Sequence, residues 1–168
     1  PRVFEADQGD KIYRRSVYSF WKRGLPPPQM TIFDAPTRES CTARRERTNT
    51  PLQALVLMNE KQYFFAAMAL AKNLLEQNDL SDQRRIEIAY EKITSKLPGK
   101  QIGTRLQEAL TQFRAVYRED TDAAKQMISQ YDQMKSAADW TADRQSELAS
   151  MTMLVHALLN LDAAKMRE

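Results

Sequence analysis

The stretch TPLQALVLMNEKQYFFAAMALAKNLLEQ, residues 50–77, carries the strongest helical signals in the chain. Thr50 precedes a proline and stands three residues before Gln53, an arrangement that predicts a capped helix start with proline at the first helical position. This helix is expected to end near Asn59, where Asn59 and Gln62 form a second capping pair. The stretch therefore predicts two consecutive helices.

The second of these helices carries two parallel rows of apolar residues. Side chains three and four positions apart lie on the same face of a helix. The rows are Tyr63, Ala67, Leu70 and Leu74, and Phe64, Met68, Ala71 and Leu75. Two neighbouring rows make a broad apolar face, so the pattern predicts a helix that is buried on more than one side.

The helical period recurs along most of the chain. Further amphipathic helices are predicted over residues 10–23, 81–97, 104–117, 120–131 and 141–158. No stretch alternates with period two for long enough to predict a strand. We therefore predict an all-α fold, an irregular bundle of about six or seven helices.

One segment lacks this period. Pro26, Pro27 and Pro28 predict extended backbone, because proline biases the preceding residue away from helix. From Met30 to Asn49 no period of 2 or 3.6 is sustained. We predict a long, ordered, Pro/Arg-rich loop near the N-terminus, and loops of this length are often functional.

Length and composition allow one domain with a real core. The chain has 168 residues, 42% of them hydrophobic, and a single cysteine, which excludes a disulfide framework and multi-cysteine zinc sites. The longest charge-free stretch, residues 148–161, is too short to cross a bilayer, so no transmembrane segment is expected. The opening PRVFEADQGD is not a signal peptide. We expect a single helical domain over residues 1–168, the C-terminal fragment of a longer multidomain protein.

The formal net charge of +3 is unevenly distributed. Residues 1–48 carry ten Lys/Arg and six Asp/Glu, a net +4, whereas the remaining residues have a net charge of −1. This basic excess favours an acidic partner surface. It lacks the concentrated stripe of lysine and arginine that nucleic-acid binding requires, so no nucleic-acid partner is predicted.

The candidate ligand- or partner-binding residues lie in the Pro/Arg-rich loop. Its arginines could clamp a carboxylate, sulfate or phosphate with paired hydrogen bonds. They could equally pair with the acidic neighbours and hold an irregular backbone in place, and we favour this structural role because the charges nearly cancel. The candidates are Asp34, Arg38, Glu39, Arg44, Arg45, Arg47 and Asn49, with Glu46 as a further acidic neighbour.

Two single residues have side chains that could take part in catalysis, Cys41 and His156. Cys41 lies near several arginines that favour a reactive thiolate, but a buried, inert cysteine is the simpler expectation. His156 is the only histidine and falls about 130° from the centre of its apolar stripe on a helical wheel. It could be a haem ligand or a general base, but a partly exposed surface histidine is the simpler expectation. No catalytic residue and no metal site is predicted.

Several motifs resemble a known family. YRRSVYSFWKRGLPPPQMTIFDAPTRESCTARRERTNTPLQALVLMNEKQY, residues 13–63, closely resembles the planctomycete-specific C-terminal domain of large secreted, cytochrome-c-associated proteins, a domain of unknown function. RRIEIAYEKITSKLPG from Arg84 and ELASMTMLVHALLNLDAAKMRE from Glu147 resemble later helices of that domain. The chain departs from the family pattern at Lys96–Pro98 and Ala163–Met166.

The resemblance implies an extracytoplasmic location, periplasmic or secreted, and haem c in the missing N-terminal part of the protein. This chain has no Cys-x-x-Cys-His motif, so no cofactor is expected within it. The leading functional hypothesis is a non-catalytic scaffold or interaction domain. Its partner would be the N-terminal domains of its own full-length protein, another protein or an acidic glycan.

The alternative hypothesis is a component of an extracytoplasmic redox or polysaccharide-processing enzyme that binds an anionic substrate through the Arg-rich loop. Whether the intact protein is an enzyme stays open at this point.

Overall fold

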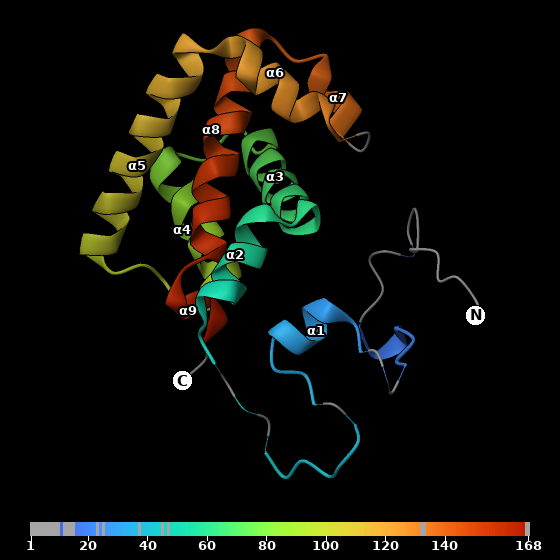
Figure 1. Ribbon diagram of the computed structural model, residues 1–168. Coiled ribbons are helices and arrows are strands. Elements are labelled where there is room, and N and C mark those ends of the chain that lie inside the picture. The colour runs from blue at the N-terminus through green and yellow to red at the C-terminus, as the bar shows by residue number, and fades with distance from the viewer. Residues whose placement is uncertain are drawn as a thin grey trace. The chain divides into compact units, whose positions relative to one another are not determined.

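Figure 1 shows a computed structural model of the chain. The structure describes residues 11, 16–22, 24, 26–36, 38–44, 46, 48–131 and 134–166, with backbone only at 16, 135 and 136. Contacts between Cα atoms divide the chain into two compact units, Pro1–Thr48 and Asn49–Glu168.

The first unit contains little regular structure among its described residues. A short 3-10 helix, η2, spans Ser16–Tyr18, and a five-residue helix, α1, spans Pro28–Ile32. The helix expected over residues 10–23 does not continue beyond η2, and residues 10, 12–15 and 23 lie outside the described part. The extended segment expected after the prolines is also wrong at Pro28, because a proline at the first helical position loses no hydrogen bond and already has a helical φ.

All regular secondary structure in the described residues of the second unit is helical, which confirms the all-α fold. Six of its helices have nine residues or more, in agreement with the expected number, and two are single turns that sequence periodicity did not predict. The elements are α2 (Pro51–Asn59), α3 (Lys61–Glu76), α4 (Asp82–Thr94), α5 (Lys100–Glu119), α6 (Thr121–Ser129), α7 (Lys135–Ala138), α8 (Ala142–Leu159) and α9 (Asp162–Lys165).

The starts of α2, α4 and α8 follow capping signals in the sequence. The Thr50 hydroxyl accepts from the Gln53 amide at 3.3 Å, and the Gln53 side chain accepts from the Thr50 amide at 3.2 Å, which completes the predicted capping box of α2. Ser81 and Thr141, the first residues of two predicted helices, cap α4 and α8 with their side chains. The prediction of a second capping pair, Asn59 with Gln62, is wrong, because the Asn59 side chain instead donates to the carbonyl of Leu55 at 3.0 Å.

The connection between α4 and α5 differs from the expectation. α4 ends at Thr94, because Ser95 adopts a left-handed φ of 60°. Leu97, the last residue of the predicted helix, therefore lies beyond α4 and is 65% exposed. α5 begins at Lys100 rather than near Thr104, with Gly103 inside its first turn, where a glycine costs less than in a helix interior.

The core of the second unit forms around α8. This helix packs against α3, α5 and α6, and it runs through the middle of the bundle in Figure 1. The largest completely buried apolar side chains come from α3, α4, α5, α6 and α8: Met68, Leu74, Ile86, Leu110, Ile128, Leu148, Met151, Leu154, Val155 and Leu158. No helix in the described part of the chain is both long enough and apolar enough to cross a membrane.

Candidate functional site

The structure describes only part of the Pro/Arg-rich loop over residues 30–49. Arg38 has a left-handed φ of 63°, and its guanidinium carbon lies 4.8 Å from the centre of the Trp21 ring, a cation–π contact in place of the acidic partner expected for it. Arg44 is exposed. Arg45 and Arg47 lie outside the described residues, so their predicted pairing stays a prediction.

The acidic residues of this loop differ in their contacts and in their exposure. Asp34, also at a left-handed φ of 59°, accepts hydrogen bonds of 2.8 Å from both the amide and the hydroxyl of Thr48. These bonds join residues fourteen positions apart and close the segment into a loop. Glu39 and Glu46 are exposed. One carboxylate of the segment therefore holds its backbone through Thr48, whereas the predicted pairing of the arginines with acidic neighbours stays a prediction.

Cys41 and Asn49 lie on the surface. Cys41 is a free, exposed cysteine, so the expectation of a buried cysteine is wrong. The reason is that the described residues on both sides of it, 38–40 and 42–44, are exposed and form no helix that could bury it. Asn49 belongs to the second unit, where its side-chain amide donates to the Asp162 carboxylate at the start of α9.

The α2 helix is fixed by polar contacts but turns apolar side chains outward. Its buried residues are Gln53, the capping glutamine, and Leu57. Leu52, Leu55 and Met58, spaced three apart on one face, are 53%, 56% and 58% exposed. We call these three residues the apolar face of α2. A nine-residue helix is marginal in isolation, so its packing and polar anchors must position it.

His156 supplies one of these anchors. Its Nε2 lies 2.9 Å from the carbonyl oxygen of Leu57, and because a carbonyl only accepts, Nε2 carries the proton. The imidazole also meets the Phe64 ring edge-on, with 5.0 Å between ring centres. His156 is only 8% exposed, which corrects the expectation of a surface histidine. The helical wheel failed because α8 is buried on several sides, its small polar residues included.

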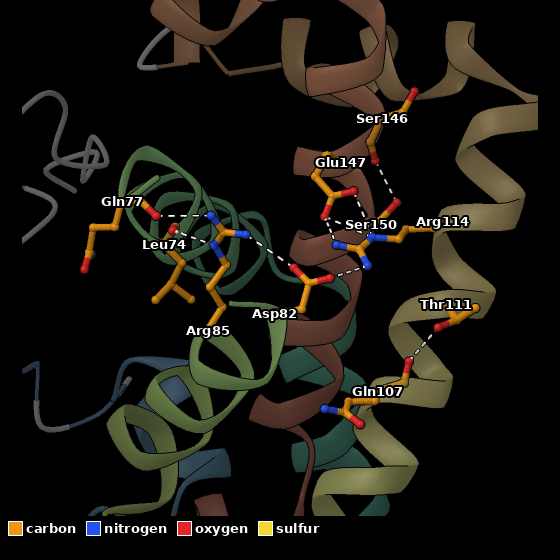
Figure 2. A network of polar contacts seen from close by, with 10 residues as sticks. All are labelled: Leu74, Gln77, Asp82, Arg85, Gln107, Thr111, Arg114, Ser146, Glu147 and Ser150. Atoms are coloured by element: carbon orange, nitrogen blue, oxygen red, sulfur yellow. Dashed lines mark hydrogen bonds and ion pairs between the residues drawn. The ribbon is translucent and has the colours of Figure 1, made fainter. Parts of the chain in front are cut away.

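A network of ion pairs and hydrogen bonds joins four helices on another part of the second unit (Figure 2). Arg114 of α5 donates from Nε to both Glu147 carboxylate oxygens of α8 at 2.9 and 3.0 Å, and from Nη1 to Asp82 of α4 at 2.6 Å. Arg85 of α4 donates to the other Asp82 oxygen at 3.3 Å. It also donates to the carbonyls of Leu74 and Gln77 at 3.1 Å, at the end of α3.

Sequence analysis missed this network. The pairs made by Arg114 join separate helices across 32 and 33 positions, so no local motif marks them. Arg114 holds the pKa of Asp82 below its usual range, with a smaller effect from Arg85 and against the influence of burial. Glu147 and Asp82 in turn raise the pKa of the Arg114 guanidinium, which therefore stays charged. The arrangement is typical of a structural clamp.

A small hollow lies between α4 and the first turns of α5. Its volume is about 240 Å³, and its lining includes Gln83, Glu87, Lys100 and Gln107. This volume lies below the range of about 300–1,000 Å³ that is typical of ligand pockets. Glu87 is also engaged, because it accepts from Gln83 at 3.0 Å and from Arg84 at 3.1 Å. The hollow therefore has no feature that selects a ligand.

The chemistry available in the described residues is limited. They contain no group of three or more His, Cys, Asp or Glu side chains that could hold a metal ion. The only histidine is occupied by the Leu57 carbonyl and is buried. What the described structure does present is an apolar helix face on a rigid bundle, an arrangement suited to contact with another protein surface.

The sequence places the chain in a family. Residues 1–110 match the family PSD1, described as a protein of unknown function (DUF1553), and the chain belongs to this family. The match confirms the resemblance to a domain of unknown function. No curated protein and no solved structure was found to match the chain.

Proposed function

We propose that the chain is a non-catalytic helical scaffold that docks another protein domain through the apolar face of α2. The observation that carries the proposal is the outward orientation of Leu52, Leu55 and Met58 on an anchored helix. Burying the exposed half of each side chain would contribute about 1 kcal/mol, or roughly 3 kcal/mol together. A gain of roughly 3 kcal/mol is large for a surface that consists of three side chains.

The partner that fits this face is apolar and uncharged. Thr48–Asn59 contains no charged residue, so nothing on α2 would compensate a buried charge of a partner. We propose that the partner is another domain of the polypeptide that contains this chain, an extracytoplasmic protein as the resemblance to secreted, cytochrome-c-associated proteins suggests. The basic excess of residues 1–48 is compatible with a second, polar contact made by the first unit.

Site-specific photo-crosslinking in the intact polypeptide tests this proposal. The crosslinking residue p-benzoylphenylalanine replaces Leu55, and the matched control replaces Val116 on α5, which has the similar exposure of 57%. We expect the probe at position 55, and not at position 116, to crosslink to a peptide of the same polypeptide outside residues 1–168. A crosslink between two copies, one confined to residues 1–168, equal crosslinking at both positions or no crosslink would each refute it.

A second candidate function is supported by Arg44. This side chain is exposed and makes no ion pair within the described part of the chain, so it is available to an anionic ligand. We propose binding of a sulfated or uronic oligosaccharide as the alternative. Calorimetric titration with a heparin-derived oligosaccharide should then show binding that Arg44→Gln weakens and that Arg118→Gln, a matched exposed arginine on α5, leaves unchanged. An absence of binding by the folded protein would exclude this function.

A further inference from the structure

Residues 38–44, near the C-terminal end of the first unit, combine three properties of a proteolytic cleavage site. All seven are exposed, and none of them belongs to a helix or strand. A protease needs accessible backbone that can adopt an extended conformation, and exposed irregular segments are where proteolytic cleavage concentrates. The segment also contains Arg44, followed in the sequence by a second arginine.

Of the two arginines described in the first unit, Arg44 is the more available to a protease. Its side chain makes no hydrogen bond or ion pair within the described part of the chain. Arg38 differs, because its guanidinium lies over Trp21 and the next residue is acidic. A pocket that recognises arginine by its charge can therefore bind Arg44 without first breaking an existing contact.

From Thr48 onward, the described residues are protected. Thr48 is held by Asp34, and the capping box at Thr50 begins the helices of the second unit. Exposed arginines of that unit, such as Arg105 and Arg118, lie within α5. A helical backbone must open before a protease can bind it, so cleavage there is limited by the population of the open form.

We propose that residues 38–44 are a processing site for an endoprotease specific for basic residues, which hydrolyses the peptide bond after Arg44. Water adds to the carbonyl carbon of Arg44, the bond to the following nitrogen breaks, and this nitrogen takes up a proton. The products are a carboxylate at Arg44 and an amine at residue 45. The second product retains every helix from α2 to α9.

Limited digestion of the full chain with trypsin, followed by mass spectrometry, tests this inference. We expect the earliest fragment that retains the C-terminus to begin at residue 45, and to accumulate at least about tenfold faster than any cut within residues 49–168. The triple variant Arg44→Gln, Arg45→Gln and Arg47→Gln should lose this rapid cut. The matched variant Arg105→Gln and Arg118→Gln, both exposed on α5, should keep it.

Circular dichroism at 222 nm confirms that each variant is folded before digestion. The inference is refuted if cuts within residues 49–168 appear as fast as the cut after Arg44. It is also refuted if the triple variant is cut in this segment at an unchanged rate.

Discussion

Replacing Arg114 with methionine should destabilise the second unit by about 2–3 kcal/mol. The substitution keeps the length of the side chain but leaves the carboxylates of Asp82 and Glu147 without their shared cation. Removing one partner of a completely buried pair costs about 3–5 kcal/mol. The side chains of Arg114, Glu147 and Asp82 are 22%, 25% and 41% exposed, so solvent screening reduces this cost.

The free energy of unfolding is measured by urea titration and the melting temperature by circular dichroism. For a unit of this size the loss corresponds to a decrease of roughly 10 °C in the melting temperature. Arg114→Lys should fall between the wild type and Arg114→Met, because an ammonium cannot form the forked contact with Glu147. If Arg114→Met unfolds outright, this intermediate variant still measures the effect.

The matched control is Lys125→Met, which removes a pair with Asp122 whose side chains are 53% and 83% exposed. We expect this control to change stability by less than about 0.5 kcal/mol. Equal effects of Arg114→Met and Lys125→Met would show that the network is an ordinary surface feature and would refute the structural clamp.

Three further results are expected. The pKa of Asp82 is lowered in the folded protein. The stabilising effect of the Asp82 carboxylate is therefore present above the unfolded pKa of about 3.9 and is lost as the pH falls through the folded pKa. Asp82→Asn should remove this part of the acid dependence of stability in urea titrations. Leu110→Ala should cost about 2–5 kcal/mol in the same titration, because this side chain is completely buried, whereas Leu97→Ala should be nearly neutral. Thr50→Ala should cost about 1 kcal/mol and accelerate hydrogen exchange of the α2 amides, and unchanged exchange would contradict the role of the capping box.

Helix identity and the starts of α2, α4 and α8 could be predicted because their causes are local. The capping residues Thr50, Ser81 and Thr141 act within three positions, and the structure confirms each of them. The predicted helix ends were less accurate. Ser95 ends α4 in a left-handed conformation, and no glycine stands at this position to indicate the end in the sequence. Short helices such as α7 and α9 are too brief to establish a period.

The contacts that define the site depend on tertiary structure. His156 and Leu57 are 99 positions apart, so no spacing in the sequence could indicate that they meet. One signal was available for His156, because residues 148–161 carry no charge on any face, which is typical of a helix that is surrounded. The outward apolar face of α2 could not be predicted either, since apolar residues three apart normally indicate a buried face.

The contacts of Arg85 also have a consequence for the order of folding. They join residues only 11, 8 and 3 positions apart, whereas Arg114 reaches Glu147 across 33 positions. Short loops close at a lower entropic cost, so the α3–α4 hairpin should form before α5 docks onto α8. In stopped-flow refolding, Arg85→Met should mainly slow folding, and Arg114→Met should mainly accelerate unfolding. The contacts of the Arg85 guanidinium would then form early in folding, and those of the Arg114 guanidinium would form late.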